Sequence, residues 1–273
     1  MSVGEALRAA AERLASASDT ARLDAELLMA HALGVSRSDM LLRHMRDLAP
    51  ESFAALIERR ERHEPVAYIT GSAEFFGLAL NVSPATLIPR GDSEALVEAA
   101  LERVGDRGRA IDLGTGTGAL LLAVLANLAA WRGIGVDASQ GALAIAANNA
   151  ASLGLNTRAA FQLGNWREAG WADDLGTFDL ILCNPPYVED TAVLDRQVTD
   201  FEPASALFAG PEGLDDYRIL IPQLRGLMKP GGIAILEIGA NQADAVSALA
   251  DAAGFGVQLR RDLAGRPRAL ILE

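Results

Sequence analysis

The heptapeptide Asp112-Leu113-Gly114-Thr115-Gly116-Thr117-Gly118 gives the clearest indication of the fold. It completes the expected strand 110–113, and its three alternate glycines allow the backbone to turn tightly and to approach a ligand closely. The helix expected after it begins with free backbone amides, which favour ligand binding. A tight turn without a ligand is the weaker interpretation. The pattern therefore predicts a strand, a ligand-binding turn and a helix, as in an open α/β sheet.

Strands and helices alternate on either side of this turn. Strands are expected over 110–113, 134–137, 158–163, 178–183, 232–238, 255–261 and 267–272, and helices over 93–104, 140–152, 215–228 and 241–253. This alternation predicts a mostly parallel sheet with helices on both faces. The last two strands are separated only by 262–266, which is too short for a crossover helix, so we expect one antiparallel pair.

The N-terminal region has the pattern of a helical bundle. Ser2 and Glu5 form a capping box before a helix over 3–16. Further helices are expected over 20–33, which Gly34 should end, over 37–45, and over 50–63, which Pro50 should begin as a first-turn proline. Pro65 is expected to end the helices, and a short hairpin should turn at Gly77. The predicted division is a helical domain (1–64), a linker with a β-hairpin (65–92) and an α/β domain (93–273).

The composition limits the chemistry. Half of the 273 residues are apolar, but no run approaches the roughly 20 residues of a membrane span, so no membrane partner is expected. There is no signal-like start, and the single cysteine, Cys183, suits a reducing cytoplasm and is expected to be a buried strand residue. All three histidines (His31, His44 and His63) precede residue 65, which excludes a Ser-His-Asp triad or a His/Cys zinc site from the α/β domain. No metal is predicted.

The charge bears on the substrate. The net charge is −12, and most of it lies after residue 64. Enzymes that bind duplex nucleic acid usually carry a basic face that displaces counterions. The acidic α/β domain therefore favours a protein or small-molecule substrate, and no direct binding of nucleic acid is expected.

Two carboxylates indicate the cofactor. Asp137 ends the second strand, where its carboxylate can accept both hydroxyls of a ribose. The glycines also satisfy the dinucleotide fingerprint, so a nicotinamide enzyme competes. Asp112 favours S-adenosylmethionine, because a carboxylate before the glycines can hold a cationic amino acid head but would repel a pyrophosphate. Trp166 can pack against an adenine or belong to the core. The predicted cofactor site comprises Asp112, Gly114, Thr115, Gly116, Thr117, Gly118, Asp137, Trp166 and Asn184.

The motif Asn184-Pro185-Pro186-Tyr187 indicates the methyl acceptor. Its prolines fix φ and remove two donors, so the Asn184 side-chain oxygen and the Pro185 carbonyl can accept both hydrogens of one planar NH₂ group. Holding both N–H bonds directs the nitrogen lone pair to the methyl group, and Tyr187 would stack on the flat group. The catalytic set is therefore predicted as Asn184, Pro185, Pro186 and Tyr187. A rigid turn is the alternative, and the motif alone does not separate adenine, cytosine and glutamine.

Two further features bear on the site. The segment 188–214 is longer than an idle loop of about 12–15 residues, so it is expected to shape a substrate pocket. Glu237 ends the apolar stretch Ile233–Leu236 of a predicted strand, where it either faces the site or caps the sheet.

The sequence resembles the release-factor glutamine methyltransferases (the HemK/PrmC family) over nearly its whole length. The resemblance is carried by Pro65–Gly71, Glu74–Gly77, Leu87–Arg90 with Glu94, the glycine turn, Asn184–Tyr187, Phe201–Pro203 and Glu237–Gly239. It implies a Rossmann-like, class I S-adenosylmethionine-dependent methyltransferase sheet behind a small N-terminal helical bundle. It also implies methylation of the glutamine side chain in the Gly-Gly-Gln loop of peptide chain release factors, with the helical domain docking the release factor.

The resemblance assigns Gly114–Gly118, Asp137 and Trp166 to the cofactor and Asn184–Tyr187 to the glutamine. Two positions depart from the family pattern: Gly91 replaces a usual proline, which predicts a looser segment, and Asn165 replaces a common aspartate beside Trp166. A nucleic-acid amino methyltransferase is the nearest alternative. A nicotinamide oxidoreductase would leave the Asn184–Tyr187 motif without a role.

Overall fold

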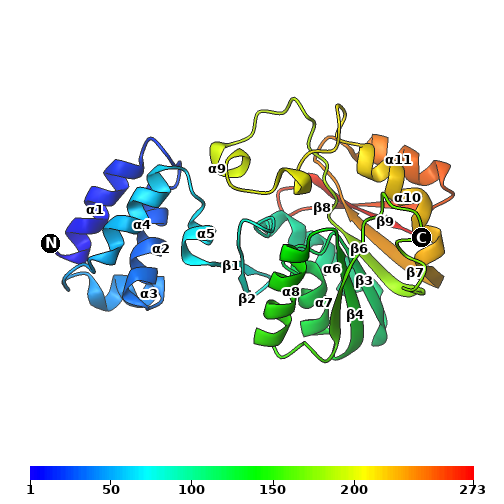
Figure 1. Ribbon diagram of the computed structural model, residues 1–273, viewed down its shortest axis with the longest axis horizontal. Coiled ribbons are helices and arrows are strands. Elements are labelled where there is room, and N and C mark those ends of the chain that lie inside the picture. The colour runs from blue at the N-terminus through cyan, green and yellow to red at the C-terminus, as the bar shows by residue number, and fades with distance from the viewer. The chain divides into compact units, whose positions relative to one another are not determined.

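The computed structural model describes residues 1–273, which form two compact units. The helical unit comprises Met1–Ser72 with Leu194–Glu202, and the sheet unit comprises Ala73–Val193 with Pro203–Glu273 (Figure 1). The sequence placed the end of the helical domain at residue 64 and all of 93–273 in the α/β domain. The helical unit instead extends to Ser72 and includes a later segment of the chain.

The helical unit contains α1 (Val3–Leu14), α2 (Ala21–Leu33), α3 (Arg37–Asp39), the π-helical turn Met40–His44, α4 (Ser52–Glu61), α5 (Val66–Thr70) and α9 (Arg196–Thr199). The capping box of Ser2 and Glu5 is confirmed, as is Gly34 at the end of α2 with φ 69°. Two expectations are wrong. Helix α4 begins at Ser52, so Pro50 precedes it, and Pro65 does not end the helices but is the N-cap of α5.

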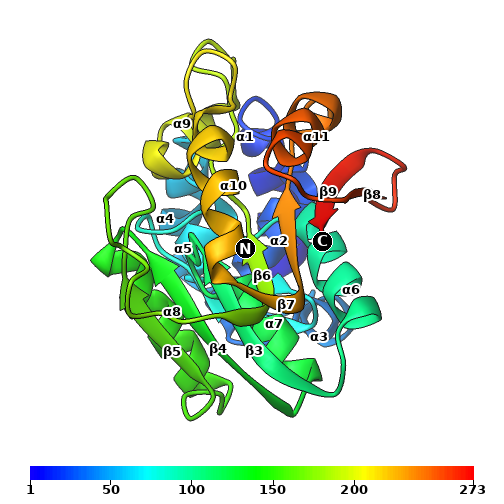
Figure 2. The ribbon, with the colours of Figure 1, turned by 90° about the vertical axis from the view of Figure 1, so that its right-hand side faces the viewer.

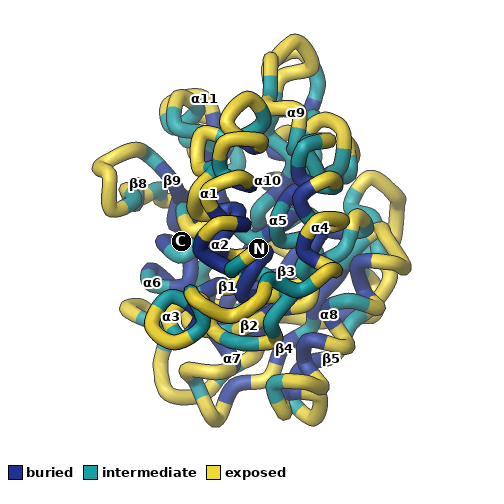
Figure 3. Tube along the Cα trace, turned by 90° about the vertical axis from the view of Figure 1, so that its left-hand side faces the viewer, coloured by how far each residue is buried: buried dark blue, intermediate teal, exposed yellow.

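The core of the helical unit combines apolar packing with one buried ion pair. Leu7, Leu28 and Ile57 are buried in one hydrophobic cluster, and Figure 3 shows buried and exposed residues alternating along α1 and α2. Arg60 of α4 lies 2.7 Å from Asp24 of α2 and donates to Gln197 of α9 at 3.3 Å. The second contact attaches the segment 194–202 to this unit.

The sheet unit is built on seven strands in the order β5-β4-β3-β6-β7-β9-β8. Their bounds are β3 Arg107–Leu113, β4 Ala130–Asp137, β5 Ala159–Leu163, β6 Phe178–Cys183, β7 Met228–Glu237, β8 Val257–Arg261 and β9 Pro267–Leu272. Strands β3 to β7 are parallel, and β9 runs antiparallel to both β7 and β8, which confirms the expected antiparallel pair.

Helices cover both faces of this sheet (Figure 2). One face packs against α6 (Glu94–Arg103), α7 (Ala119–Asn127) and α8 (Gln140–Ser152), and the other against α10 (Asp215–Leu227) and α11 (Ala243–Ala252). The expected hairpin is present as β1 (Ser72–Phe75) and β2 (Leu78–Asn81), with positive φ at Phe76 and Gly77. No helix of the protein is both long and apolar enough to span a bilayer.

The strand order explains where a ligand can bind. The chain builds β3, β4 and β5 outward in one direction and then returns to place β6 on the other side of β3. Leu113 and Cys183, the last residues of β3 and β6, are register partners. The glycine turn and Asn184 therefore follow adjacent strands at a topological switch point, where open α/β sheets bind ligands.

Candidate active site

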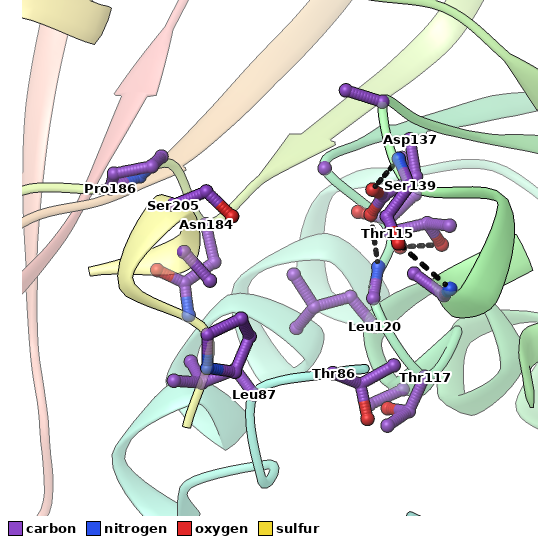
Figure 4. A pocket seen from close by; sticks show the side chains of 18 of the residues that line it. Thr86, Leu87, Thr115, Thr117, Leu120, Asp137, Ser139, Asn184, Pro186 and Ser205 are labelled. Carbon is purple, nitrogen blue, oxygen red and sulfur yellow. Dashed lines mark hydrogen bonds between the residues drawn. The ribbon is translucent and has the colours of Figure 1, made fainter. Parts of the chain in front are cut away.

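A cavity of about 570 Å³ opens at this switch point. That volume lies within the usual range of small-molecule sites, roughly 300–1,000 Å³. Its wall is formed by the segment before α6, the glycine turn, the end of β4, the loop after β5, the start of the loop after β6 and the loop before α10. Figure 4 shows Asp137, Ser139 and Thr115 in one part of this wall and Asn184, Pro186 and Ser205 in another.

The glycine turn requires its glycines. Gly114, Gly116 and Gly118 have φ values of 73°, 54° and 81°, which other residues rarely adopt. A Cβ on Gly114 would also come within 3.2 Å of the Trp166 ring. The backbone amides of Gly114 and Thr115 both donate to the Val136 carbonyl, at 2.8 and 3.0 Å. These bonds attach the turn to the neighbouring strand.

Asp137 anchors the turn and also lines the cavity. One carboxylate oxygen accepts from the Gly116 amide and the other from the Ser139 amide, each at 2.9 Å (Figure 4). Each oxygen can accept a further hydrogen bond. Burial raises the pKa of Asp137, although the amides of Gly116 and Ser139 oppose this. The side chain is thus a fixed acceptor for a ligand with adjacent hydroxyls.

Asp112 is the most buried carboxylate of the wall. It is 1% exposed, and one oxygen accepts from the Thr115 hydroxyl at 2.7 Å. The other oxygen has no hydrogen-bond partner. Burial raises the pKa of Asp112 to about 7, and the charge of Asp137 adds to this effect. An unpartnered carboxylate oxygen in a ligand cavity is suited to a cationic group, which would compensate the cost of its burial.

Trp166 lines the cavity, as predicted, and its orientation depends on a residue that the sequence did not indicate. Its indole N–H donates to Asp216 at 2.8 Å, and Arg167 donates to the other oxygen of the same carboxylate at 2.9 Å. Asp216 is 2% exposed and also lines the cavity. The sequence does show two acidic residues, Asp215 and Asp216, at the start of α10, but such a pair is equally typical of an ordinary helix start and does not indicate a role beside Trp166. Asn165 uses its own side chain locally, accepting from the Arg167 amide and donating to Glu168.

Asn149 is a second residue that sequence reasoning missed. It is completely buried in α8, and its amide nitrogen donates to the carbonyls of Thr117 and Asn81, each at 3.0 Å. Its oxygen accepts from the Asn81 backbone amide at 2.7 Å. Asn149 therefore ties the glycine turn to strand β2. A single asparagine in an alanine-rich helix does not indicate this role.

The structure brings only part of the acceptor motif to the cavity. Asn184 and Pro186 line the wall, whereas Pro185 and Tyr187 do not. The Asn184 carbonyl lies 3.9 Å from the position of a Cβ on Gly114, so the two motifs approach each other closely. The side chain of Asn184 makes no hydrogen bond within the protein and is therefore available to a ligand. Cys183 is buried, as expected, and burial raises the pKa of its thiol.

The loop 188–214 contributes to the cavity through its second half. Pro203, Ser205, Ala206 and Phe208 line the wall. The preceding residues, Leu194–Glu202, belong to the helical unit. The loop thus supplies residues to both units.

The seven-stranded sheet, the glycine turn after β3, the carboxylate after β4 and the acceptor motif after β6 together define a Rossmann-like, class I S-adenosylmethionine-dependent methyltransferase. A methyltransferase from Pyrococcus furiosus has the same fold, with a TM-score of 0.52 at 17% identity, covering 72% of this chain and 89% of that one. Two family models match: the PrmC N-terminal domain over residues 5–71 and a methyltransferase domain over residues 105–254.

The chain belongs to the release factor glutamine methyltransferase family, which confirms the resemblance. It is 43% identical to the release factor glutamine methyltransferase of Rhodospirillum rubrum, over 92% of this chain and 78% of that protein. It is 40% identical to that of Caulobacter vibrioides, over 98% of this chain and 94% of that protein. The protein is an enzyme whose cofactor is S-adenosylmethionine, and the nicotinamide oxidoreductase that the glycine turn left open is excluded.

Proposed function

We propose that this enzyme transfers a methyl group from S-adenosylmethionine to the side-chain amide nitrogen of the glutamine in the Gly-Gly-Gln motif of peptide chain release factors. The observation that carries the proposal is the unpaired side chain of Asn184 at the cavity wall, directly before Pro185 and beside the glycine turn. The names of the relatives support the same substrate.

The residues around the cavity fit the cofactor. The unpartnered oxygen of Asp112 would accept from the cationic amino group, and the two oxygens of Asp137 would accept from the ribose hydroxyls. Gly114–Gly118 lets the backbone approach the cofactor, and the Trp166 ring would pack against the adenine. Thr115 and Thr117 belong to the same wall, where Thr115 orients Asp112. When bound, the cofactor supplies an electrophilic methyl group on a sulfonium.

The acceptor residues overcome the poor nucleophilicity of an amide nitrogen. The Asn184 side-chain oxygen and the Pro185 carbonyl would accept the two hydrogens of the glutamine NH₂ group, which directs the nitrogen lone pair toward the methyl group. Transfer would form an N–C bond as the S–C bond breaks, and the proton that the amide nitrogen loses would pass to solvent. The transition state is favoured by position and hydrogen bonding, since acceptors fixed in advance need no reorganisation during the reaction.

The helical unit is proposed to dock the release factor. Its match to the PrmC N-terminal domain supports this role. Its exposed large apolar side chains include Leu42 and Leu48, each 81% exposed.

Methyl transfer from labelled S-adenosylmethionine to purified release factor tests the proposal. Label is expected on the intact factor and not on a factor whose Gly-Gly-Gln glutamine is changed to alanine. Label on nucleic acid and not on the release factor would reverse the conclusion in favour of an amino methyltransferase of bases.

A further inference from the structure

Tyr187, the last residue of the acceptor motif, is held at both ends by the last residue of strand β7 and the segment that follows it. Its hydroxyl donates to Glu237 at 3.2 Å, and its main-chain carbonyl accepts from the Gln242 side chain at 3.0 Å. The same Gln242 amide donates to the Gly213 carbonyl at 3.1 Å, and its oxygen accepts from the Gly239 amide at 3.0 Å. Tyr187 therefore has little freedom to rotate.

Glu237 is an unusual partner for a tyrosine hydroxyl, because it is a carboxylate in the core. It is the last residue of β7 and 1% exposed. Its Oε1 lies 4.0 Å from the Arg268 guanidinium on β9, and its Oε2 has no hydrogen-bond partner. A buried ionic group of this kind rarely adds stability over an apolar side chain. Its placement is therefore better explained by what it holds.

The contacts of Glu237 continue to the cavity wall. Arg268 also lies 2.8 Å from Asp92, which in addition accepts from Arg266. Asp92 adjoins Ser93, a cavity-lining residue, and lies two residues after Arg90, another one. The sequence predicts a looser segment at Gly91, but the next residue, Asp92, ties this segment to Arg268 on β9. A series of charged contacts, buried at Glu237 and Arg268 and partly exposed at Asp92, connects Tyr187 with the segment that forms the opposite part of the wall.

We infer that Glu237 is a positioning residue of the acceptor site, whose carboxylate, supported by Arg268, holds the Tyr187 hydroxyl and so fixes the Asn184–Tyr187 loop for methyl transfer. The inference rests on the proposed function, because that function defines what the loop binds. Gln242 holds the main chain of the loop, and Glu237 holds its side chain. Loss of Glu237 should therefore slow transfer without weakening the binding of the cofactor, whose proposed ligands are all elsewhere.

The charge of Glu237 depends on pH within the working range of most enzymes. Burial raises the pKa of Glu237 to about 7, although Ser93, Arg268 and Tyr187 oppose this and Asp92 adds to it. Burial and the charge of Glu237 raise the pKa of Tyr187, so its hydroxyl remains a donor. The polar and charged groups around Glu237 are Tyr187 after β6, Arg268 on β9, Asp92 and Ser93 before α6, Tyr217 on α10, and Asp262 through Arg268.

Three variants test the kinetic consequence: Glu237→Gln, Tyr187→Phe and the double variant. Glutamine keeps an acceptor of the same shape but removes the charge. We expect each single variant to lose roughly tenfold in kcat, with an unchanged Kd for S-adenosylmethionine, and the double variant to lose no more than either single variant. Asp179→Asn is the matched control, because it removes the charge of a carboxylate that pairs with Lys229 at the other end of β6. It should leave kcat unchanged.

A tyrosine NMR signal separates this inference from the proposed function. The chain has three tyrosines, Tyr68, Tyr187 and Tyr217, so ring-labelled protein should give three signals, of which Tyr187→Phe removes one. The Tyr187 signal should shift with pH around 7 in the wild type and not in Glu237→Gln. Failure of the wild type to methylate release factor would refute the proposed function only. A Tyr187 signal that ignores pH, a wild-type kcat in Glu237→Gln, or additive losses in the double variant would overturn the role of Glu237.

Discussion

The glycine turn and the acceptor loop follow neighbouring strands and line one cavity, yet different contacts hold them. The turn depends mainly on partners closer in the sequence: Thr115 donates to Asp112, three positions away, and Gly116 donates to Asp137, 21 positions away on the next strand. The acceptor loop depends on distant residues, because Tyr187 is held by Glu237 and Gln242, 50 and 55 positions later. A local motif can therefore specify the cofactor side, whereas the acceptor side requires the packed sheet.

The largest expected effect separates the two sides at Asn184. We expect Asn184→Ala to lower kcat for release-factor methylation by about a hundred- to a thousandfold, because a preorganised acceptor in the transition state is lost. The Kd for S-adenosylmethionine, measured by calorimetry, should change by no more than about threefold. Turnover close to that of the wild type would refute the assignment of Asn184 to the methyl acceptor. A large loss of cofactor affinity would instead place it on the cofactor side.

The converse experiment uses Asp137. Asp137→Ala removes both proposed acceptors of the ribose and the partner of the Gly116 amide. We expect the Kd for S-adenosylmethionine to rise by about ten- to a hundredfold, because water that replaces the carboxylate recovers part of the roughly 1.5–3 kcal/mol that each hydrogen bond to a charged group contributes. At saturating cofactor, kcat should recover much of its wild-type value. Calorimetry that gives wild-type affinity would overturn this assignment.

Asp112 should make cofactor binding depend on pH. Its pKa is raised to about 7 in the folded protein, and a cationic amino group binds the ionised form. Affinity should therefore fall by roughly tenfold per pH unit as the pH is lowered from 7 to 5.5, and Asp112→Asn should bind weakly with no such slope. An unchanged slope in the variant would assign the titration to another group.

The same carboxylate has the opposite effect on the stability of the free protein. Because the folded pKa of Asp112 is raised from 3.8 to about 7, its contribution to the free energy of unfolding is fully present below about pH 4 and is lost as the pH rises through 7. Urea unfolding of wild type and Asp112→Asn should therefore diverge between pH 4 and 7, with the wild type losing more stability.

The smallest expected effect on binding concerns Asn149, which holds the glycine turn from 32 positions away. Asn149→Ala leaves the Thr117 carbonyl and the Asn81 amide without this partner. We expect the free energy of unfolding to fall by about 1–3 kcal/mol for the unsatisfied groups, but the Kd for S-adenosylmethionine to rise by no more than about threefold. A tenfold or larger rise in Kd would contradict the view that nearby contacts suffice for the cofactor side.

Much of the fold follows from local patterns. Helix α8 and strands β6 and β9 have the predicted bounds, because regular apolar periodicity and adjacent turn residues mark their ends. The expectations failed where packing decides. Helix α5 forms after Pro65, and residues 194–202 belong to the helical unit through Gln197 and Arg60. Neither the short helix α5 nor the contact between Gln197 and Arg60 leaves a periodic signal in the sequence.

The candidate site divides in the same way. The sequence alone indicates several residues of the candidate site. A turn with positive φ favours the glycines, the ends of strands mark Asp112 and Asp137, and the two prolines that fix the next turn mark Asn184. Three other residues were not identifiable: Asp216, Glu237 and Arg268. The partners of Asp216 and Glu237 lie 49 or 50 positions away, and Arg268 contacts Glu237 from a neighbouring strand. The sequence shows a charged residue but not the residue with which it pairs. Local chemistry is encoded in short segments, whereas the pairing of buried charges follows only when the sheet brings distant segments together and excludes water.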